Sequence, residues 1–108
     1  MGQDGGWVND VRLVGRLSAE PQPRGLPSGD EVVQLRVVVP RDPGSVGGRV
    51  DTIDVACWSG RTRRTCGRLH EGDVVQVEGV LRRRFFRTGA ATVSRYEVEA
   101  RRLSRVSR

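Results

Sequence analysis

Apolar and polar residues alternate along five stretches of the chain, and a period of two predicts β-strands. In residues 11–17, for example, Leu13 and Leu17 fall on the face opposite to Arg16. The stretches 31–40, 50–58, 73–86 and 93–103 follow the same rule. We therefore expect five strands, each of which turns one face toward a core.

The segments between these stretches predict one helix and three loops. Thr62, Cys66 and Leu69 fall at helical spacing, so we expect one short helix after residue 58, closed by Gly72. Residues 18–30 hold three prolines and two glycines and predict a turn-rich loop. Residues 41–49 and 87–94 predict two further loops, the second of which joins the last two strands as a hairpin.

Three strands, a short helix and a long hairpin follow one another in the order of the five-stranded OB-fold barrel, an all-β fold. A parallel α/β fold is excluded, because it needs a crossover helix after nearly every strand. The 108 residues suffice for one domain, and we place its core at about residues 8–104.

The side-chain pattern divides the stretch "GVLRRRFFRTG", residues 79–89, between two faces. Leu81 and Phe85 continue the inward face of the fourth strand, so we expect Phe85 to pack under the hairpin or against a partner subunit. Arg82, Arg84 and Phe86 point outward on the same pattern. No face is assigned to Arg83 and Arg87, which lie where the hairpin twists.

Exposed aromatic rings beside arginines predict a surface for single-stranded nucleic acid. Trp58 ends the outward set of the third strand, as Phe86 does on the fourth, and bases stack on such rings while guanidinium groups contact phosphates. Alternatively, either ring could fill a subunit interface. The candidate contact residues on the outward faces are Trp58, Phe86, Arg82, Arg84, Arg36 and Arg16.

Charge is distributed unevenly along the chain. Residues 1–80 carry 10 Arg and 11 Asp or Glu, a net charge of −1, whereas residues 81–108 carry 9 Arg and 2 Glu, a net charge of +7. A basic field confined to one segment favours a polyanionic partner, although a solvated charged face is the alternative.

Other classes of function find little support. Cys57 and Cys66 are too far apart in sequence for a metal motif, and His70 is the only histidine, so we expect no metal, no cofactor and no catalytic residues. We expect free thiols, with that of Cys66 exposed on the helix. The chain has no apolar run long enough to span a membrane and no signal peptide, which indicates a cytoplasmic protein. Binding to DNA would make it nucleoid-associated.

The motifs together resemble the bacterial single-stranded-DNA-binding proteins, an OB-fold family. The resemblance rests on "NDVRLVGRL" with the later "PSG" turn, on "VACW", on "EGDVVQVEGVLRRR" and on "YEVEA", and it covers about residues 9–103. It implies a homotetramer, with a dimer possible, that binds single-stranded DNA in replication, recombination or repair. It also places the stacking aromatics of the family on Trp58 and Phe86, and its basic positions on Arg82 and Arg84.

The chain departs from the family pattern at several positions. Thr52, Pro43 and Gly25 stand where members commonly carry aromatics, which predicts fewer stacked bases and binding that is more sensitive to salt. The basic end "ARRLSRVSR" stands where members have an acidic tip that recruits repair enzymes, so we expect a short paralogue or a truncated form. An OB-fold assembly module that acts through protein partners, and an RNA-binding module, are the alternative functions.

Overall fold

The computed structural model describes residues 5–42, 44 and 48–108. Its elements are β1 (Val11–Leu17), β2 (Gln22–Gly25), β3 (Glu31–Pro40), β4 (Val50–Cys57), α1 (Gly60–Cys66), β5 (Val74–Thr88) and β6 (Ala91–Ser107). Residues 1–4, Pro43 and residues 45–47, part of the predicted loop 41–49, lie outside the described residues.

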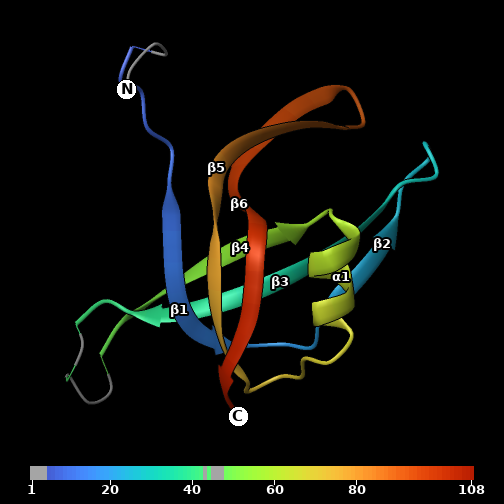
Figure 1. Cartoon of the computed structure of the whole chain (residues 1–108). Helices are drawn as coiled ribbons and strands as arrows, with labels where there is room; N and C mark the ends of the chain where they lie inside the picture. The colour runs from blue at the N-terminus through green and yellow to red at the C-terminus, as the bar shows by residue number, and fades with distance from the viewer. Residues whose placement is uncertain (1–4, 43, 45–47) are drawn as a thin grey trace.

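The strands form one closed sheet in the order β1-β5-β6-β4-β3-β2, and β1 also pairs with β3. The β1–β3 pairing joins Arg16 to Val38 and Leu17 to Val37, and it closes the barrel that Figure 1 shows. Parallel pairing of β4 with β6 completes the ring. The predicted all-β OB barrel, with one helix before the long final hairpin, is confirmed.

The core is built from the inward residues that the alternation identifies. Leu17, Val37, Val55, Val75 and Val77 are each at most 1% exposed. Burying a Val or Leu side chain stabilises a fold by roughly 1.5–3 kcal/mol, so these residues hold the strands in register.

β2 lies inside the segment that the sequence predicts as a loop. All four of its residues are exposed, so no apolar alternation marks it. It pairs with β3 through its backbone, from Gln22 opposite Gln34 to Gly25 opposite Glu31. Its proline is tolerated because β2 is an edge strand.

The helix is shorter than the sequence predicts. The Ser59 hydroxyl caps its N-terminus by accepting a hydrogen bond of 3.1 Å from the Thr62 amide, and α1 ends before Gly67. The prediction that Gly72 closes the helix is therefore wrong. Gly72 has a φ of +95°, which glycine adopts easily, and it forms the turn into β5, where its amide donates to the Leu17 carbonyl.

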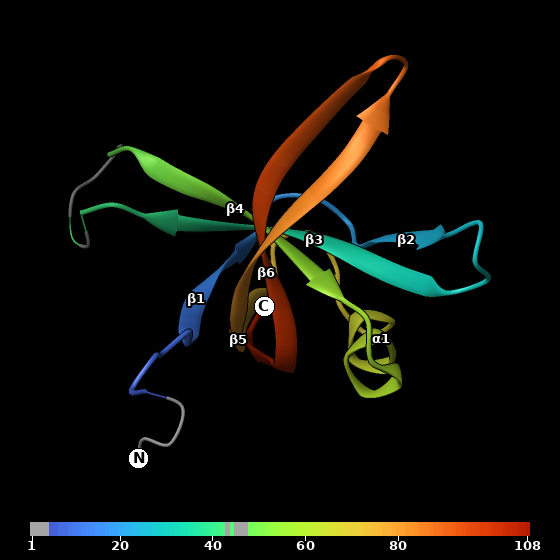
Figure 2. The ribbon, with the colours of Figure 1, turned by 90° about the horizontal axis from the view of Figure 1, so that it is seen from above.

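The final hairpin is longer than predicted, because β5 runs to Thr88 and β6 begins at Ala91. The residues predicted as a loop, 87–94, are mostly strand. They carry few apolar residues because they project from the barrel, as Figures 1 and 2 show. We call residues 82–97 the arm. At its base Gly79 lies so close to β6 that a Cβ there would collide with the Glu99 carbonyl, next to a register shift between Glu78 and Gly79.

Two residues predicted on the packed face are exposed. Leu81 is 44% exposed and Phe85 is 67% exposed in the single chain, so Phe85 does not pack under the hairpin. The predicted face is right, because Leu81 pairs with buried Val98. Beyond the barrel, no other described part of the chain covers this face, and packing of Phe85 on a partner subunit stays a prediction.

The prediction of an exposed Cys66 thiol is also wrong. Cys66 is 3% exposed and Cys57 is fully buried, and both thiols are free. Cys66 lies on the face of α1 that covers the barrel core. A hydrogen bond with Cys66, together with burial, raises the pKa of the Cys57 thiol, so it stays protonated.

Candidate nucleic-acid interface

The arm presents two different faces, because successive residues of a strand point to opposite sides and paired residues share a side. Arg82 pairs with Glu97, Arg84 with Arg95 and Phe86 with Val93. These six residues form what we call the groove face. Arg83, Phe85, Arg87, Ser94 and Tyr96 form what we call the outer face, through the pairs Arg83–Tyr96 and Phe85–Ser94.

A groove of about 620 Å³ lies between the arm and the β2–β3–β4 part of the barrel. Phe86 and Arg95 line it from the arm, and Arg36 lines it from β3. Phe86 is 41% exposed, and the Arg95 guanidinium lies 5.5 Å from the centre of its ring. Figure 2 shows the arm projecting over this side of the barrel. The predicted residues Phe86 and Arg36 therefore share one groove.

Trp58 is partly buried rather than openly exposed as predicted. The Arg84 guanidinium covers it, at 4.8 Å from the ring centre. The indole Nε1 is buried and has no hydrogen-bond partner. No other buried side-chain nitrogen or oxygen among the described residues lacks one. Arg63 Nε donates to the Trp58 carbonyl at 3.1 Å, so α1 fixes the backbone of this residue.

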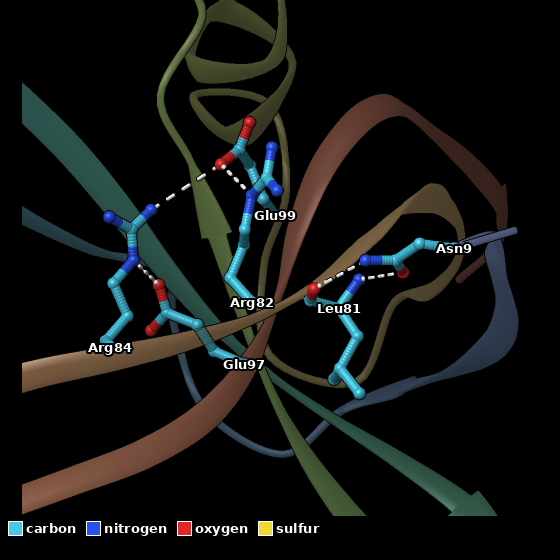
Figure 3. A network of polar contacts seen from close by, with 6 residues as sticks. All are labelled: Asn9, Leu81, Arg82, Arg84, Glu97 and Glu99. Carbon is cyan, nitrogen blue, oxygen red and sulfur yellow. Dashed lines mark hydrogen bonds and ion pairs between the residues drawn. The ribbon is translucent and has the colours of Figure 1, made fainter. Parts of the chain in front are cut away.

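Two glutamates of β6 hold the predicted arginines at the base of the arm (Figure 3). Arg84 Nε donates to Glu97 Oε2 at 2.8 Å, and Arg82 Nε donates to Glu99 Oε1 at 3.3 Å. Arg84 Nη2 also lies 3.6 Å from Glu99. Glu97 is only 5% exposed. A phosphate group must compete with these carboxylates for both arginines.

Arg36 and Arg16 differ in their surroundings. Arg36 lies in the groove, 3.9 Å from Asp54, and both side chains are exposed enough for water to weaken the pair. Arg16 is exposed on β1, where it pairs in register with Val38 of β3. Val38 lies two residues from Arg36, on the same face of β3. It does not line the groove.

Sequence reasoning missed several groove residues, among them Glu20, Gln22, Arg24 and Arg95. Gln22 and Arg24 line it from β2, whose exposed residues gave no strand signal, and Glu20 lines it from the preceding turn. Backbone and side-chain hydrogen bonds from Glu71 and His70 lower the pKa of the Glu20 carboxyl. Arg95 could have been found, since the alternation of the last strand places it outward beside Tyr96.

Other kinds of site find no support in the part of the chain that the structure describes. No three His, Cys, Asp or Glu side chains there group closely enough to hold a metal ion. No helix among these residues is long and apolar enough to cross a membrane.

Comparison with known proteins identifies the family. The model of the single-strand binding protein family matches residues 8–106. The chain belongs to this family. A solved structure titled "Plasmodium falciparum SSB complex with ssDNA" is similar over 99% of this chain and 100% of that one, with a TM-score of 0.77 and 20% sequence identity, which shows the shared fold. None of the curated proteins compared with the chain matches it. As a family member, the chain is a single-stranded-DNA-binding protein.

Proposed function

We propose that the chain binds and protects single-stranded DNA in replication, recombination or repair, without reading its base sequence, and that the strand lies in the groove under the arm. Phe86 stacks a base, and Arg36, Arg95 and Arg24 contact phosphates along the groove. The supporting observation is the position of Phe86, a 41% exposed ring in a groove of about 620 Å³ lined by arginines. Stacking on a ring tolerates every base, because every base has a flat face.

Trp58 and Arg84 form the second part of the proposed site. Arg84 covers the Trp58 ring in the free protein. We propose that bound DNA draws Arg84 toward a phosphate and uncovers the ring for a base. Arg82 and Arg16 add positive charge beside this path.

Titration of oligo-dT into the Phe86→Ala variant tests this function. Removing one stacking ring weakens binding by roughly 5- to 150-fold, since each stacked base contributes about 1–3 kcal/mol. Val106→Ala is the matched control, because Val106 is 56% exposed at the far end of β6 from the arm. Unchanged affinity in Phe86→Ala would remove the groove as the binding site.

Tryptophan fluorescence reports on Trp58 separately. The chain has two tryptophans, and Trp7 is 85% exposed, so Trp7→Phe leaves Trp58 as the reporter. Oligo-dT quenches this variant if a base stacks on Trp58. If oligo-dT bound this variant with a saturable isotherm but left its tryptophan fluorescence unchanged, stacking would be restricted to Phe86.

We also propose that the protein is a bacterial, nucleoid-associated protein of the cytoplasm, since single-stranded DNA arises during replication there, and that it assembles as a homotetramer. Val14 on β1 is 45% exposed, an apolar side chain that a second copy could cover. Sedimentation with and without oligo-dT measures the mass. A dimer with weak DNA binding would instead favour an assembly module that acts through protein partners.

A further inference from the structure

The outer face of the arm carries two exposed aromatic rings that the groove does not use. Phe85 is 67% exposed and Tyr96 is 59% exposed, compared with 41% for Phe86 in the groove. They lie together, because Phe85 and Tyr96 both contact Arg83. Neighbouring exposed rings on a soluble protein mark a surface for a partner.

Arg83 is fixed between these rings. Its Nε and Nη2 donate to the Ser94 hydroxyl at 3.2 and 3.0 Å, and its Nη1 donates to the Tyr96 hydroxyl at 3.5 Å. Its guanidinium lies 5.3 Å from the centre of each ring. A side chain held this way loses little conformational freedom when a ligand binds, so the outer face is ordered in advance.

Charge differs between the two faces of the arm. On the groove face, Glu97 offsets the charge of Arg84, and Glu99, two residues further along β6, offsets the charge of Arg82. On the outer face, neither Arg83 nor Arg87 has a carboxylate partner within ion-pair distance among residues 5–42, 44 and 48–108. The uncompensated arginines therefore stand beside the more exposed rings, which favours a ligand that is both flat and anionic.

We propose that the outer face of the arm is a second contact surface for single-stranded DNA, so that one strand passes around the arm and stacks bases on both of its faces. This proposal rests on the proposed function. Phe85 and Phe86 are adjacent in β5 and point to opposite sides, so only the backbone of a two-stranded ribbon separates the two surfaces. A strand that leaves the groove at Phe86 reaches Phe85 by passing the tip of the arm at Gly89.

The test compares the two faces with oligo-dT of increasing length. Phe85→Ala combined with Tyr96→Ala removes the outer rings, and Phe86→Ala removes the groove ring. The outer-face variant binds the shortest oligonucleotides as the wild type does, but binds longer ones about tenfold more weakly, the loss expected for one stacked base. Phe86→Ala weakens binding at every length.

Photocrosslinking locates the contact directly. Oligonucleotides that contain 5-iododeoxyuridine crosslink to the aromatic ring on which the base stacks, and mass spectrometry identifies the residue. Tyr96 is the only tyrosine in the chain, which makes its adduct easy to recognise. Crosslinks at Tyr96 or Phe85 in the wild type support the second surface.

Two results would overturn the proposal. One is wild-type affinity of the outer-face variant at all lengths together with crosslinks confined to the groove. The other is a lower mass of this variant with unchanged DNA binding, which would make the outer face a contact between copies.

Failure of the wild type to bind any oligo-dT would overturn the proposed function instead. If the double variant does not fold, Arg83→Gln tests the same face and weakens binding of the longer oligonucleotides only.

Discussion

Arg84 joins the structural and the binding parts of this molecule in one side chain. It binds Glu97 at 2.8 Å, lies near Glu99 at 3.6 Å and covers the Trp58 ring at 4.8 Å. Its side chain is 37% exposed, whereas that of Glu97 is 5% exposed. Loss of the pair therefore costs Glu97 more free energy than Arg84, because water can solvate the arginine but not the buried carboxylate. Pairing with Glu97 therefore explains why an arginine is held over the tryptophan in the free protein.

The pair predicts unequal effects of two neighbouring substitutions. Arg84→Gln leaves the buried Glu97 charge without a partner and lowers the free energy of unfolding by about 1–3 kcal/mol, less than for a fully buried pair because water reaches Arg84. Arg82→Gln is the matched control and costs less than about 1 kcal/mol, since its partner Glu99 is 26% exposed. Urea denaturation measures both values. Adding Glu97→Gln to Arg84→Gln should recover part of the loss, and a fully additive double variant would contradict this account.

At the scale of elements, the arm depends on how its base is fixed to the barrel. The last backbone pair between β1 and β5 joins Val11 to Gly79. Two residues further along each strand, Asn9 continues the ladder with its side chain: its Nδ2 donates to the Leu81 carbonyl at 2.9 Å, and its Oδ1 accepts from the Leu81 amide at 2.8 Å (Figure 3). A side-chain amide thus takes the place of a strand residue where the arm begins.

Asn9→Ala should loosen the base of the arm without unfolding the barrel. A hydrogen bond contributes about 0.5–1.5 kcal/mol, and these two are exposed and therefore at the lower end of that range. The free energy of unfolding should fall by about 1–2 kcal/mol in total. Hydrogen exchange measured by NMR shows the local effect as faster exchange of the Leu81 amide. Asp10→Ala is the control, because no side-chain hydrogen bond of Asp10 is seen among the described residues. Equal exchange rates in both variants would mean that Asn9 does not hold the arm.

The elements also show what apolar alternation can and cannot predict. It predicted the five strands whose inward residues are buried, such as Val75 and Val77, because core packing imposes that pattern. It missed β2, which is exposed throughout and paired only through its backbone. It assigned Phe85 to the correct face of β5, but burial depends on what lies opposite, and the described residues leave Phe85 67% exposed.

Alternation also predicted part of the candidate site, because it fixes the side of a strand on which each residue points. Phe86 and Arg36 could be found from the side on which each residue points, and the groove that joins them depends on the path of the arm over the barrel. The ion pairs of Arg82 and Arg84 depend on the pairing register of β5 with β6, which the alternation does not specify. Register within a hairpin follows from turn position, and the predicted turn was too long.

For the whole molecule, the uneven charge distribution predicts strong salt dependence. The net charge of +6 comes from residues 81–108, which include the arm. Each phosphate of a single strand that an arginine neutralises releases counterions and contributes about −0.7 to the slope of log affinity against log salt concentration. Arginines that are free to contact phosphate therefore set this slope, whereas those bound to glutamates contribute less.

Three charge-neutralising variants separate these groups of arginines. Arg95→Gln, in the groove, reduces the magnitude of the slope by about 0.7, and Glu97→Gln, which releases Arg84, increases it by a similar amount. Arg68→Gln is the control, since Arg68 is exposed in the segment between α1 and β5. Figure 1 shows this segment at the opposite end of the barrel from the arm. Titrations with oligo-dT at four salt concentrations give each slope. If Arg68→Gln changed the slope as much as Arg95→Gln, binding would follow net charge alone, and the groove would lose its role in placing the strand.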